Sequence, residues 1–299
     1  MSLTKRMPRN LDVLTSLGAT LESQIMGQPN VLPQVVEALQ NGELGLTDPD
    51  RPKGTFLFLG PTGVGKTELT LAFTRHLFGE EHLVRLDMSE FQNQESVGVL
   101  LGRNEHESGL IAKRFADVEG RGTLLLDEIE KAHPRVLDLL LQILDAARIT
   151  IANGDTLDLG GFYVVCTSNI AASAMLNARH SVRSTLVRFV ESQAQAQLRP
   201  EVFARFQTVS VFDRLEYDVQ LEIAQHLLDR EIANQRSRSG IEISYAPKLV
   251  PFLTGQGVHP RLGVRPLRGC IERFVRRSLR ENLLGAGKSA IHLSPIEPS

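Results

Sequence analysis

The sequence predicts an α/β fold, in which a mostly parallel sheet is covered by helices, followed by a smaller, mainly helical α+β lid domain. Short apolar runs alternate with amphipathic helical segments up to about Asp213, which is the pattern of a parallel sheet with crossover helices. A glycine-rich segment lies between the first apolar run and the first helix. After Asp213 the sequence becomes helical and charged, which indicates a second domain.

Length and composition suit a globular protein of two domains. The chain has 299 residues, of which 42% are hydrophobic and 23% charged, so a sizeable core is expected. Its formal net charge is −2, so no chain-wide basic field favours nucleic acid or anionic lipid. The sequence has no run of about eighteen apolar residues and no cleavable leader pattern. We therefore expect a cytoplasmic protein with no membrane partner.

The two cysteines, Cys166 and Cys270, lie far apart and have neither CxxC spacing nor a nearby histidine cluster. Neither a zinc site nor a disulfide framework is indicated. We expect two free, buried thiols in a reducing compartment.

The strands and helices follow from the periodicity of the apolar residues. The strands expected in the main sheet cover residues 55–59, 83–88, 123–127, 162–169 and 208–212. The clearest helices cover residues 68–78, 135–147, 217–235 and 266–284, and two further strand patterns cover 241–244 and 290–294. We predict a short N-terminal arm at 1–20, a large nucleotide-binding domain at 21–213 and a small lid domain at 214–299.

The segment GPTGVGKT at 60–67 follows the first strand and precedes the first helix. Its glycines allow backbone N–H groups to wrap phosphate oxygens at a positive helix N-terminus. Lys66 would reach the β- and γ-phosphates, and Thr67 would ligate Mg²⁺. A glycine-rich turn without a ligand is the alternative, which the flanking strand and helix disfavour. The candidate nucleotide-binding residues are Gly60, Pro61, Thr62, Gly63, Val64, Gly65, Lys66, Thr67 and Glu68.

The segment TLLLDEIEKAH at 123–133 is an apolar strand that ends in two carboxylates. Asp127 is predicted to hold Mg²⁺, and Glu128 to orient and polarise an attacking water. Asn169 ends the strand at 162–169, where parallel sheets place residues that contact ligands. An acidic helix cap and a turn-forming asparagine are the alternatives. Together with the phosphate loop, these residues predict hydrolysis of a nucleoside triphosphate.

The segments GPTGVGKTEL, RLDMSEF, LLLDEIEKAH, TSN, LRPEVFARF and GVRPLRG occur in the order and spacing of the AAA+ module of Clp-type ATPases. From about Leu21 to its end the chain resembles that family, most closely the C-terminal ATPase module of the ClpB type. The resemblance implies an AAA+ P-loop NTPase fold with a five-stranded parallel sheet. It also implies Mg²⁺-dependent ATP hydrolysis in a homo-oligomer, usually a hexamer in ATP, that remodels protein clients.

The resemblance also implies roles for further residues. Asn169 is similar to sensor 1, Arg205 to the arginine finger presented to a neighbouring subunit's ATP, and Arg265 to the γ-phosphate-sensing arginine of sensor 2. The family usually has asparagine before the finger, whereas this chain has Ala204. An ordinary surface arginine and a basic residue at a helix start are the respective alternatives for Arg205 and Arg265.

Ile25 and Met26 are similar to the family's residues on the adenine side of the site. Their place before the phosphate loop implies packing against the base and backbone contact with it. Such an apolar pair is equally suited to a protein core.

The polar segment GRNEHESGL at 102–110 stands where the Clp family carries a pore loop with a central aromatic that grips polypeptide. An aromatic grips because it offers a large apolar area at a low entropy cost, and this segment has none. The protease-docking loop of the family is also missing between Asn169 and Arg205. We expect a ring that is not protease-coupled and does not thread unfolded chains, or grips them differently. Drift in a tolerant surface loop is the alternative.

The arginine-rich helix at 266–284 is expected to be solvated or to face another subunit, because its apolar residues share one face. Nothing before the ATPase segment resembles the family's substrate-binding N-domain or coiled-coil middle domain. Two functions remain. The first is an ATP-hydrolysing remodeller of a protein client, and the second is a nucleotide-switched oligomeric scaffold or loader with a protein or nucleic-acid client.

Overall fold

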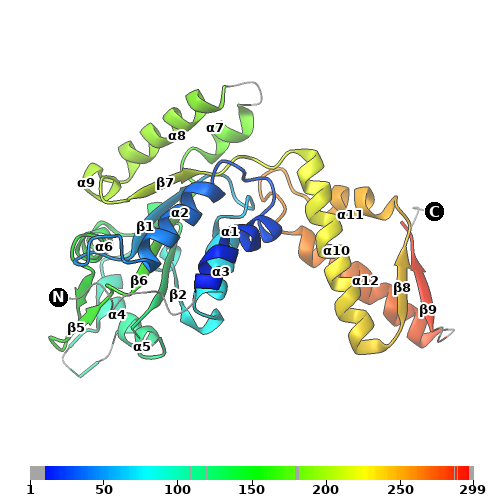
Figure 1. The fold of residues 1–299 in the computed structure, drawn as a ribbon, viewed down its shortest axis with the longest axis horizontal. Coiled ribbons are helices and arrows are strands. Elements are labelled where there is room, and N and C mark those ends of the chain that lie inside the picture. Colours follow the sequence, from blue (N-terminus) through cyan, green and yellow to red (C-terminus); the bar gives the residue numbers. More distant parts are fainter. Residues whose placement is uncertain are drawn as a thin grey trace. The chain divides into compact units, whose positions relative to one another are not determined.

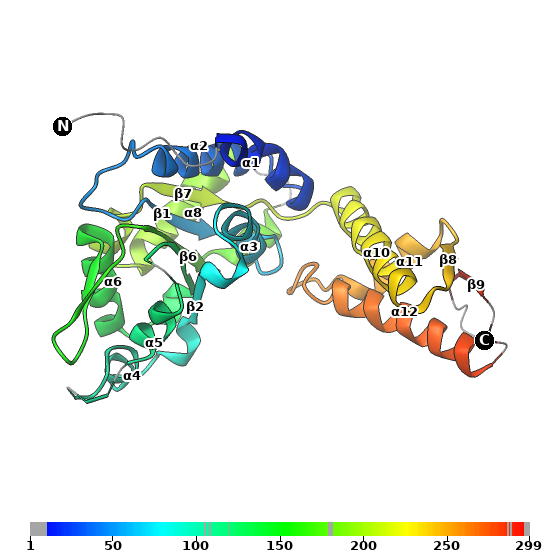
Figure 2. The ribbon, with the colours of Figure 1, turned by 60° about the horizontal axis from the view of Figure 1, so that its bottom comes forward.

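The computed structural model describes residues 11–104, 106–107, 109–118, 120–178, 182–285, 287 and 289–295. The chain divides into two units between Asp213 and Arg214, and residues 62–64 are grouped with the second unit. Figures 1 and 2 show the sheet of the first unit with its helices, and the helices and strand pair of the second. Within the described ranges, no helix is long and apolar enough to cross a membrane.

The first unit is built on a five-stranded sheet, as predicted (Figure 1). Neighbouring strands are parallel throughout this sheet. In spatial order its strands are β2 (Leu83–Asp87), β3 (Gly122–Asp127), β6 (Phe162–Ser168), β1 (Gly54–Leu59) and β7 (Thr208–Val211). All five occur where apolar runs predict strands. The central strands β3, β6 and β1 are buried along their whole length and are therefore the most continuously apolar.

Strand β1 shows this burial on both of its faces. Phe56 and Phe58 have no exposed surface, and the Phe56 ring lies 6.2 Å from the ring of Phe73 on α3 (Lys66–Leu77). Leu57 and Leu59 belong instead to a buried cluster that includes side chains of α6 (Pro134–Ala146). The strand is thus held between two apolar layers, which fixes the position of the loop that follows Leu59.

The remaining elements of the first unit cover the sheet or connect its strands. The other helices are α1 (Leu11–Gln24), α2 (Leu32–Glu43), α4 (Ser96–Leu101), α5 (Leu110–Ala116), α7 (Ala172–Asn177), α8 (Arg183–Gln197) and α9 (Pro200–Phe203). Strands β4 (Arg148–Thr150) and β5 (Thr156–Asp158) form an antiparallel pair that the sequence analysis does not predict. Their three-residue length is too short to give a clear alternation of polar and apolar residues.

The predicted N-terminal arm at 1–20 needs correction. Residues 1–10 lie outside the described part of the chain, but α1 begins at Leu11. Its side chains Leu14, Leu17 and Leu21 are buried, so residues 11–20 are part of the packed first unit. The spacing of these three leucines is that of a helix face packed on a core.

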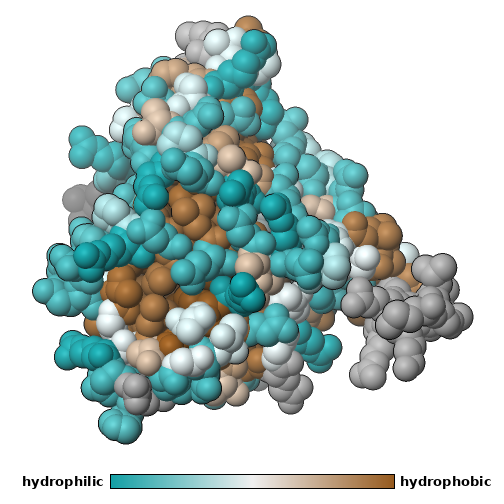
Figure 3. All heavy atoms as spheres, turned by 90° about the vertical axis from the view of Figure 1, so that its left-hand side faces the viewer, coloured by the Kyte–Doolittle hydropathy of each residue, from teal (hydrophilic) through white to brown (hydrophobic). Residues whose placement is uncertain are grey.

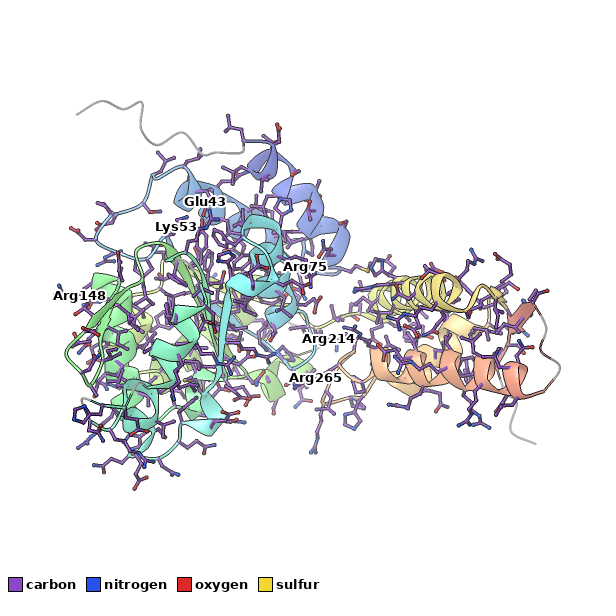
Figure 4. All side chains as sticks on the ribbon, turned by 90° about the horizontal axis from the view of Figure 1, so that it is seen from below. Glu43, Lys53, Arg75, Arg148, Arg214 and Arg265 are labelled. Atoms are coloured by element: carbon purple, nitrogen blue, oxygen red, sulfur yellow. The ribbon has the colours of Figure 1, made fainter. Side chains whose placement is uncertain are left out.

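The start of β1 is held by a partly buried polar cluster, two members of which, Glu43 and Lys53, are labelled in Figure 4. Lys53 Nζ lies 2.7 Å from Oε1 of Glu43, at the end of α2. The Tyr163 hydroxyl donates to the same carboxylate at 3.0 Å and to the carbonyl oxygen of Leu39 at 2.8 Å. These contacts tie the segment that enters β1 to β6 and to the end of α2.

The second unit has its own core. It contains α10 (Tyr217–Ser239), β8 (Glu242–Tyr245), α11 (Leu249–Gly257), α12 (Leu267–Leu284) and β9 (Ala290–Leu293). Strands β8 and β9 are parallel. The three helices and both strands contribute to one buried apolar cluster. This arrangement confirms the predicted helical α+β lid domain.

Helix α12 carries its charges away from this core. Its buried side chains include Ile271, Val275 and Leu279. Among its arginines, Arg268 and Arg276 pair with Glu272, and Arg277 pairs with Glu281. Three of the exposed arginines therefore have carboxylate partners on the same helix, which agrees with a solvated face.

Both cysteines are free, as expected. Cys166 is buried on β6, and burial raises the pKa of its thiol well above the usual range. Cys270 is half-buried, so the expectation of a buried thiol is only partly met there.

Candidate nucleotide site

The sheet brings the phosphate loop, Asp127, Glu128 and Asn169 to one edge. The phosphate loop follows β1, Asp127 ends β3, and Asn169 follows β6. These strands are neighbours in the order β3-β6-β1 and all run parallel. Their carboxyl ends therefore meet at the same edge, where open α/β sheets bind their ligands.

The phosphate loop requires its glycines. Gly60, Gly63 and Gly65 have φ angles of +147°, +76° and +106°, in the region that L side chains rarely adopt. A Cβ on Gly60 would lie 2.9 Å from the carbonyl oxygen of Phe212. Helix α3 begins directly after Gly65, so its unpaired N–H groups face the loop. Within this segment Val64 and Lys66 are buried, whereas the Glu68 side chain is exposed.

Lys66 is the most constrained side chain of the site. It is 7% exposed, and its Nζ donates hydrogen bonds to the carbonyl oxygens of Gly60 (2.5 Å) and Pro61 (2.8 Å) and to Oδ1 of Asn169 (2.9 Å). Burial lowers the Lys66 pKa to about 8, although the nearby carboxylates of Glu130, Asp127 and Glu128 oppose that shift. The ammonium is thus poorly solvated, and a phosphate anion would stabilise it.

Asp127 lies in a network of hydroxyl and guanidinium groups. Its Oδ1 accepts hydrogen bonds from Thr67 Oγ1 at 3.2 Å and from Thr167 Oγ1 at 2.6 Å. Its Oδ2 lies 2.6 Å from the guanidinium of Arg85 on β2. The adjacent oxygens of Asp127 and Thr67 are of the kind that Mg²⁺ prefers, and Lys66 and the glycines of the loop beside them supply the cation and backbone that phosphate binding needs. The residues present therefore fit a nucleotide with Mg²⁺.

Glu128 is held in an uncommon backbone conformation. Its φ of 57° is left-handed for a residue with a side chain, which costs of order 1 to 3 kcal/mol at such positions and is frequent at functional sites. Its Oε1 accepts a hydrogen bond from Asn169 Nδ2 at 3.2 Å, and its Oε2 forms an ion pair with Lys131. The left-handed turn therefore directs the carboxylate toward the end of β6.

Asn169 connects the three segments at this edge. Its side chain contacts both Lys66 and Glu128. Its backbone N–H donates to Oε1 of Glu130 at 3.1 Å. Lys66, Asn169 and Glu128 thus form one connected group of side chains, and Thr67 and Asp127 form a second, which Thr167 joins to the backbone N–H of Glu128.

Arg205 lies at the other end of the sheet. Its carbonyl oxygen accepts a hydrogen bond from Oγ1 of Thr55, near the start of β1, at 3.1 Å. From Thr55 to the phosphate loop, β1 extends about 15 Å at the usual rise per residue. The Arg205 side chain is 39% exposed and forms an ion pair with Asp145 on α6. Arg205 therefore does not reach the Lys66 group of its own chain.

The residues predicted to contact adenine are Ile25 and Met26, and the residue predicted to act as sensor 2 is Arg265. Ile25 is buried and Met26 half-buried. A Cβ built on Gly65 would lie 3.8 Å from Cγ2 of Ile25, so Ile25 lies beside the phosphate loop as well as in the core. Arg265 belongs to the second unit, where its side chain is exposed just before α12 (Figure 4). The contacts of these residues with a nucleotide remain predictions.

At both ends of the polar loop after α4, at Gly102 and Gly109, the backbone lies close to other backbone atoms. A Cβ on Gly102 would lie 2.1 Å from the carbonyl oxygen of Glu107, and one on Gly109 would lie 2.2 Å from that of Leu100. Arg103, Asn104, His106 and Glu107 are exposed, whereas Glu105 and Ser108 lie outside the described residues. The described part of the loop presents only polar and charged side chains.

Four residues of this network are absent from the predicted site: Arg85, Glu130, Lys131 and Thr167. All lie in segments that the sequence analysis singles out, since Arg85 precedes LDMSEF, Glu130 and Lys131 belong to DEIEKAH, and Thr167 precedes Ser168 and Asn169. Their position inside or next to these motifs is therefore the sequence signal that could have found them. Their partners could be identified only from the structure.

Comparison with protein families identifies the fold. Residues 51–209, more than half of the chain, match the AAA domain (Cdc48 subfamily). Residues 215–292 match the C-terminal, D2-small domain of ClpB protein. The chain is a Clp-type AAA+ ATPase module.

Individual relatives agree with this assignment. The AAA+ module is 37% identical over 287 residues to the chaperone protein ClpB of Aquifex aeolicus, covering 91% of this chain and 28% of that protein. It is 33% identical to the ATP-dependent Clp protease ATP-binding subunit ClpC of Staphylococcus epidermidis, covering 96% of this chain and 37% of that one. The chain thus spans about a third of the length of these relatives.

A solved structure shows the same fold. The S. cerevisiae Hsp104-ADP complex superimposes with a TM-score of 0.84 and 27% sequence identity, covering 97% of this chain and 52% of that chain. The predicted AAA+ fold is thereby confirmed. Membership in this family implies nucleotide binding.

Proposed function

We propose that this AAA+ module binds ATP with Mg²⁺ and hydrolyses it to remodel a protein client. The observation that carries the proposal is the meeting of Lys66, Asp127, Glu128 and Asn169 at the carboxyl edge of β3, β6 and β1. Binding alone needs the lysine and the magnesium ligands. A carboxylate next to them, held toward the same point, is what water activation needs in addition.

Each residue of the group has a distinct proposed role. Lys66 and the N–H groups at the start of α3 bind the phosphates, while Thr67 and Asp127 hold Mg²⁺. Mg²⁺ bound there would neutralise charge on the β- and γ-phosphates. Glu128 orients the attacking water and accepts its proton, and Asn169 holds the Glu128 carboxylate in place. In the same proposal Ile25 and Met26 lie on the base side, and Arg265 senses the γ-phosphate.

The position of Arg205 supports an oligomer. Because it lies at the amino edge of its own sheet beside Thr55, it can complete a site only in a neighbouring copy. Figure 3, which faces the side of Figure 1 where α9 lies, shows hydrophobic residues gathered among hydrophilic ones. Apolar areas of this kind are typical of interaction surfaces. We propose a ring, in ATP a hexamer, with Arg205 acting in trans.

The client is proposed to be a protein, by likeness to the chaperone ClpB and to Hsp104. The described loop residues at 103–107 offer no aromatic grip, so pushing or clamping of a folded partner is favoured over threading. We expect no coupling to a protease, since no docking loop of the isoleucine-glycine-phenylalanine type lies between Asn169 and Arg205.

One observation favours a second candidate. Both carboxylate oxygens of Glu128 are engaged, one by Asn169 and the other by Lys131. A base that stays paired in this way turns over slowly, which would suit a nucleotide-switched scaffold or loader. The two candidates differ in whether a partner raises ATP turnover well above its basal rate.

Sedimentation velocity of the Glu128→Gln variant, with and without ATP and Mg²⁺, tests the proposal. Loss of the base should trap the ATP-bound state, so a shift from monomer to hexamer is expected together with the loss of phosphate release. The matched control is Glu37→Gln, since Glu37 is an exposed glutamate on α2, outside the predicted site. If Glu128→Gln binds ATP but remains a monomer, a partner must complete the site and the scaffold reading takes precedence.

A further inference from the structure

We propose that Glu130 is a positioning residue that fixes Asn169 and, through it, the contacts of Asn169 with Lys66 and Glu128. The inference rests on the proposed hydrolysis of ATP, and it adds a residue for which the motif analysis gives no role. Glu130 lies two residues beyond Glu128, in the short 3₁₀ turn Ile129–Lys131.

The geometry begins with the end of β6. The ladder between β1 and β6 closes with Leu59 opposite Ser168, and the N–H of Gly60 donates to the carbonyl oxygen of Ser168 at 3.3 Å. Asn169 is the first residue beyond this ladder. Its N–H donates to Oε1 of Glu130 at 3.1 Å, so the contact joins positions 39 residues apart in the sequence. Glu130 thus supplies the acceptor where the strand ladder stops.

The consequence for the side chain of Asn169 is direct. A fixed backbone N–H restricts the φ of Asn169 and therefore the direction of its Cα–Cβ bond. From this position Oδ1 accepts from Lys66 at 2.9 Å and Nδ2 donates to Glu128 at 3.2 Å. A displacement of about 1 Å would break one of these two contacts, and misplacements of that size cost about 100-fold in rate in enzymes.

The other oxygen of Glu130 argues against a purely structural role. Its Oε2 is buried and has no hydrogen-bond partner among the described residues. Leaving a buried carboxylate oxygen unpaired is unfavourable. The same carboxylate opposes the lowering of the Lys66 pKa by burial, so Glu130 acts on the lysine of the phosphate loop as well as on the N–H of Asn169.

The test compares steady-state ATP hydrolysis of the full chain with Glu130→Ala, Glu130→Gln, Asn169→Ala and the double variant Glu130→Ala/Asn169→Ala. We expect Glu130→Ala to lower kcat by about 10- to 100-fold, with the Kd of a fluorescent ADP changed less than about threefold. Glutamine keeps an acceptor oxygen, so Glu130→Gln should stay within about threefold of the unmodified chain. In the Asn169→Ala background, loss of Glu130 should change kcat less than about twofold, because the two residues act as one unit.

Two results would overturn the inference. One is an equal loss of kcat in Glu130→Ala and Glu130→Gln. The other is a loss of kcat in the double variant that equals the product of the losses in the two single variants. If Glu130→Ala does not fold, Glu130→Asp replaces it, since the shorter side chain withdraws the acceptor. Glu90→Ala, an exposed glutamate in the corresponding turn after β2, is the matched control and should leave turnover unchanged.

These variants also separate this inference from the proposed function. If Glu128→Gln abolishes hydrolysis and Glu130→Ala does not alter it, the positioning role fails and the ATPase assignment stands. If the unmodified chain binds no ATP and releases no phosphate, both fail together.

Discussion

Oδ1 of Asn169 accepts a hydrogen bond of 2.9 Å from Nζ of Lys66. The two residues are 103 positions apart in the sequence, and the parallel pairing of β1 with β6 brings them together. The contact places the ammonium between the carbonyl oxygens of the phosphate loop and the amide that also holds Glu128. Phosphate binding by Lys66 and the position of the Glu128 carboxylate are therefore linked through the side chain of Asn169.

Replacing Lys66 with alanine is expected to abolish nucleotide binding. Lys66 is the cationic residue of the segment at 60–67. Losing its charge-assisted hydrogen bonds to phosphate should weaken ATP binding by at least about 100-fold. Isothermal titration calorimetry with ATP and Mg²⁺ measures the change. Arg75→Ala on the same helix, whose partner is Glu80, is the control. Retained micromolar affinity in Lys66→Ala would remove this lysine from the site.

ATP affinity is expected to fall as the pH rises above about 8. Burial lowers the pKa of Lys66 to about 8, so below that pH the ammonium is already charged and binding takes up no proton. Above it the free protein has lost the proton, and phosphate binding must restore it. The Kd should then rise by up to about tenfold per pH unit.

Proton uptake checks this dependence directly. Titrations at pH 8.5 in two buffers of different ionisation enthalpy should report uptake of up to about three quarters of a proton per ATP bound, and titrations at pH 6.5 should report almost none from Lys66. The Lys66→Arg variant stays charged throughout this range, so its uptake at pH 8.5 should be lower. Equal uptake by both proteins would assign the proton to another group.

Arg205→Ala is expected to retain ATP binding and to lose hydrolysis by about 10³-fold, since arginine fingers contribute at least that much where they have been measured. Arg51→Ala removes the other cation near Asp145 and serves as the matched control. The trans arrangement is tested by mixing Arg205→Ala with Glu128→Gln subunits. Each is inactive alone, but a mixed ring contains interfaces with both groups intact, so about a quarter of the original turnover should return. No recovery in an exchanging mixture would contradict the trans role.

Gly102→Ala is expected to destabilise the first unit more than Gly120→Ala does. Both glycines have left-handed φ angles, +99° and +69°. A Cβ on Gly102 would lie 2.1 Å from the Glu107 carbonyl oxygen, whereas one on Gly120 would have no atom within 4 Å. The difference in the free energy of unfolding should therefore be about 2 kcal/mol or more. Urea denaturation followed by circular dichroism measures it, and equal losses would mean that the polar loop yields easily.

Threading is tested through the same loop. The unmodified chain is expected not to translocate a tagged unfolded protein. The His106→Tyr variant adds an aromatic to the exposed polar loop and tests whether this is the side chain that the loop lacks for gripping polypeptide. Protection of the tag from an added protease reports translocation. Translocation by the unmodified chain would show that the polar loop grips polypeptide without an aromatic.

Much of the fold could be predicted from the sequence because burial imposes local patterns. The run TFLFL predicts β1 since both faces of that strand are buried. GPTGVGKT predicts the phosphate loop since only glycine adopts its positive φ angles without strain. The strands β4 and β5 could not be predicted in this way because each is three residues long. The leucines of α1 have the spacing of a buried helix face, so this helix was predictable although it was assigned to the arm.

The site also has a part that the sequence predicts and a part that only the structure shows. Lys66, Thr67, Asp127 and Glu128 stand in segments whose spacing alone predicts their chemistry. The contact of the Arg85 guanidinium with Asp127 and the hydrogen bond from Asn169 to Glu130 are visible only when strands distant in sequence are aligned, whereas the ion pair of Glu128 with Lys131 is local to the turn after β3. Periodicity records which side chains avoid water, because that depends on near neighbours along the chain. Which polar groups meet at the sheet edge, and that Arg205 lies beyond reach of its own site, follows from strand order and direction, which arise from contacts between distant segments.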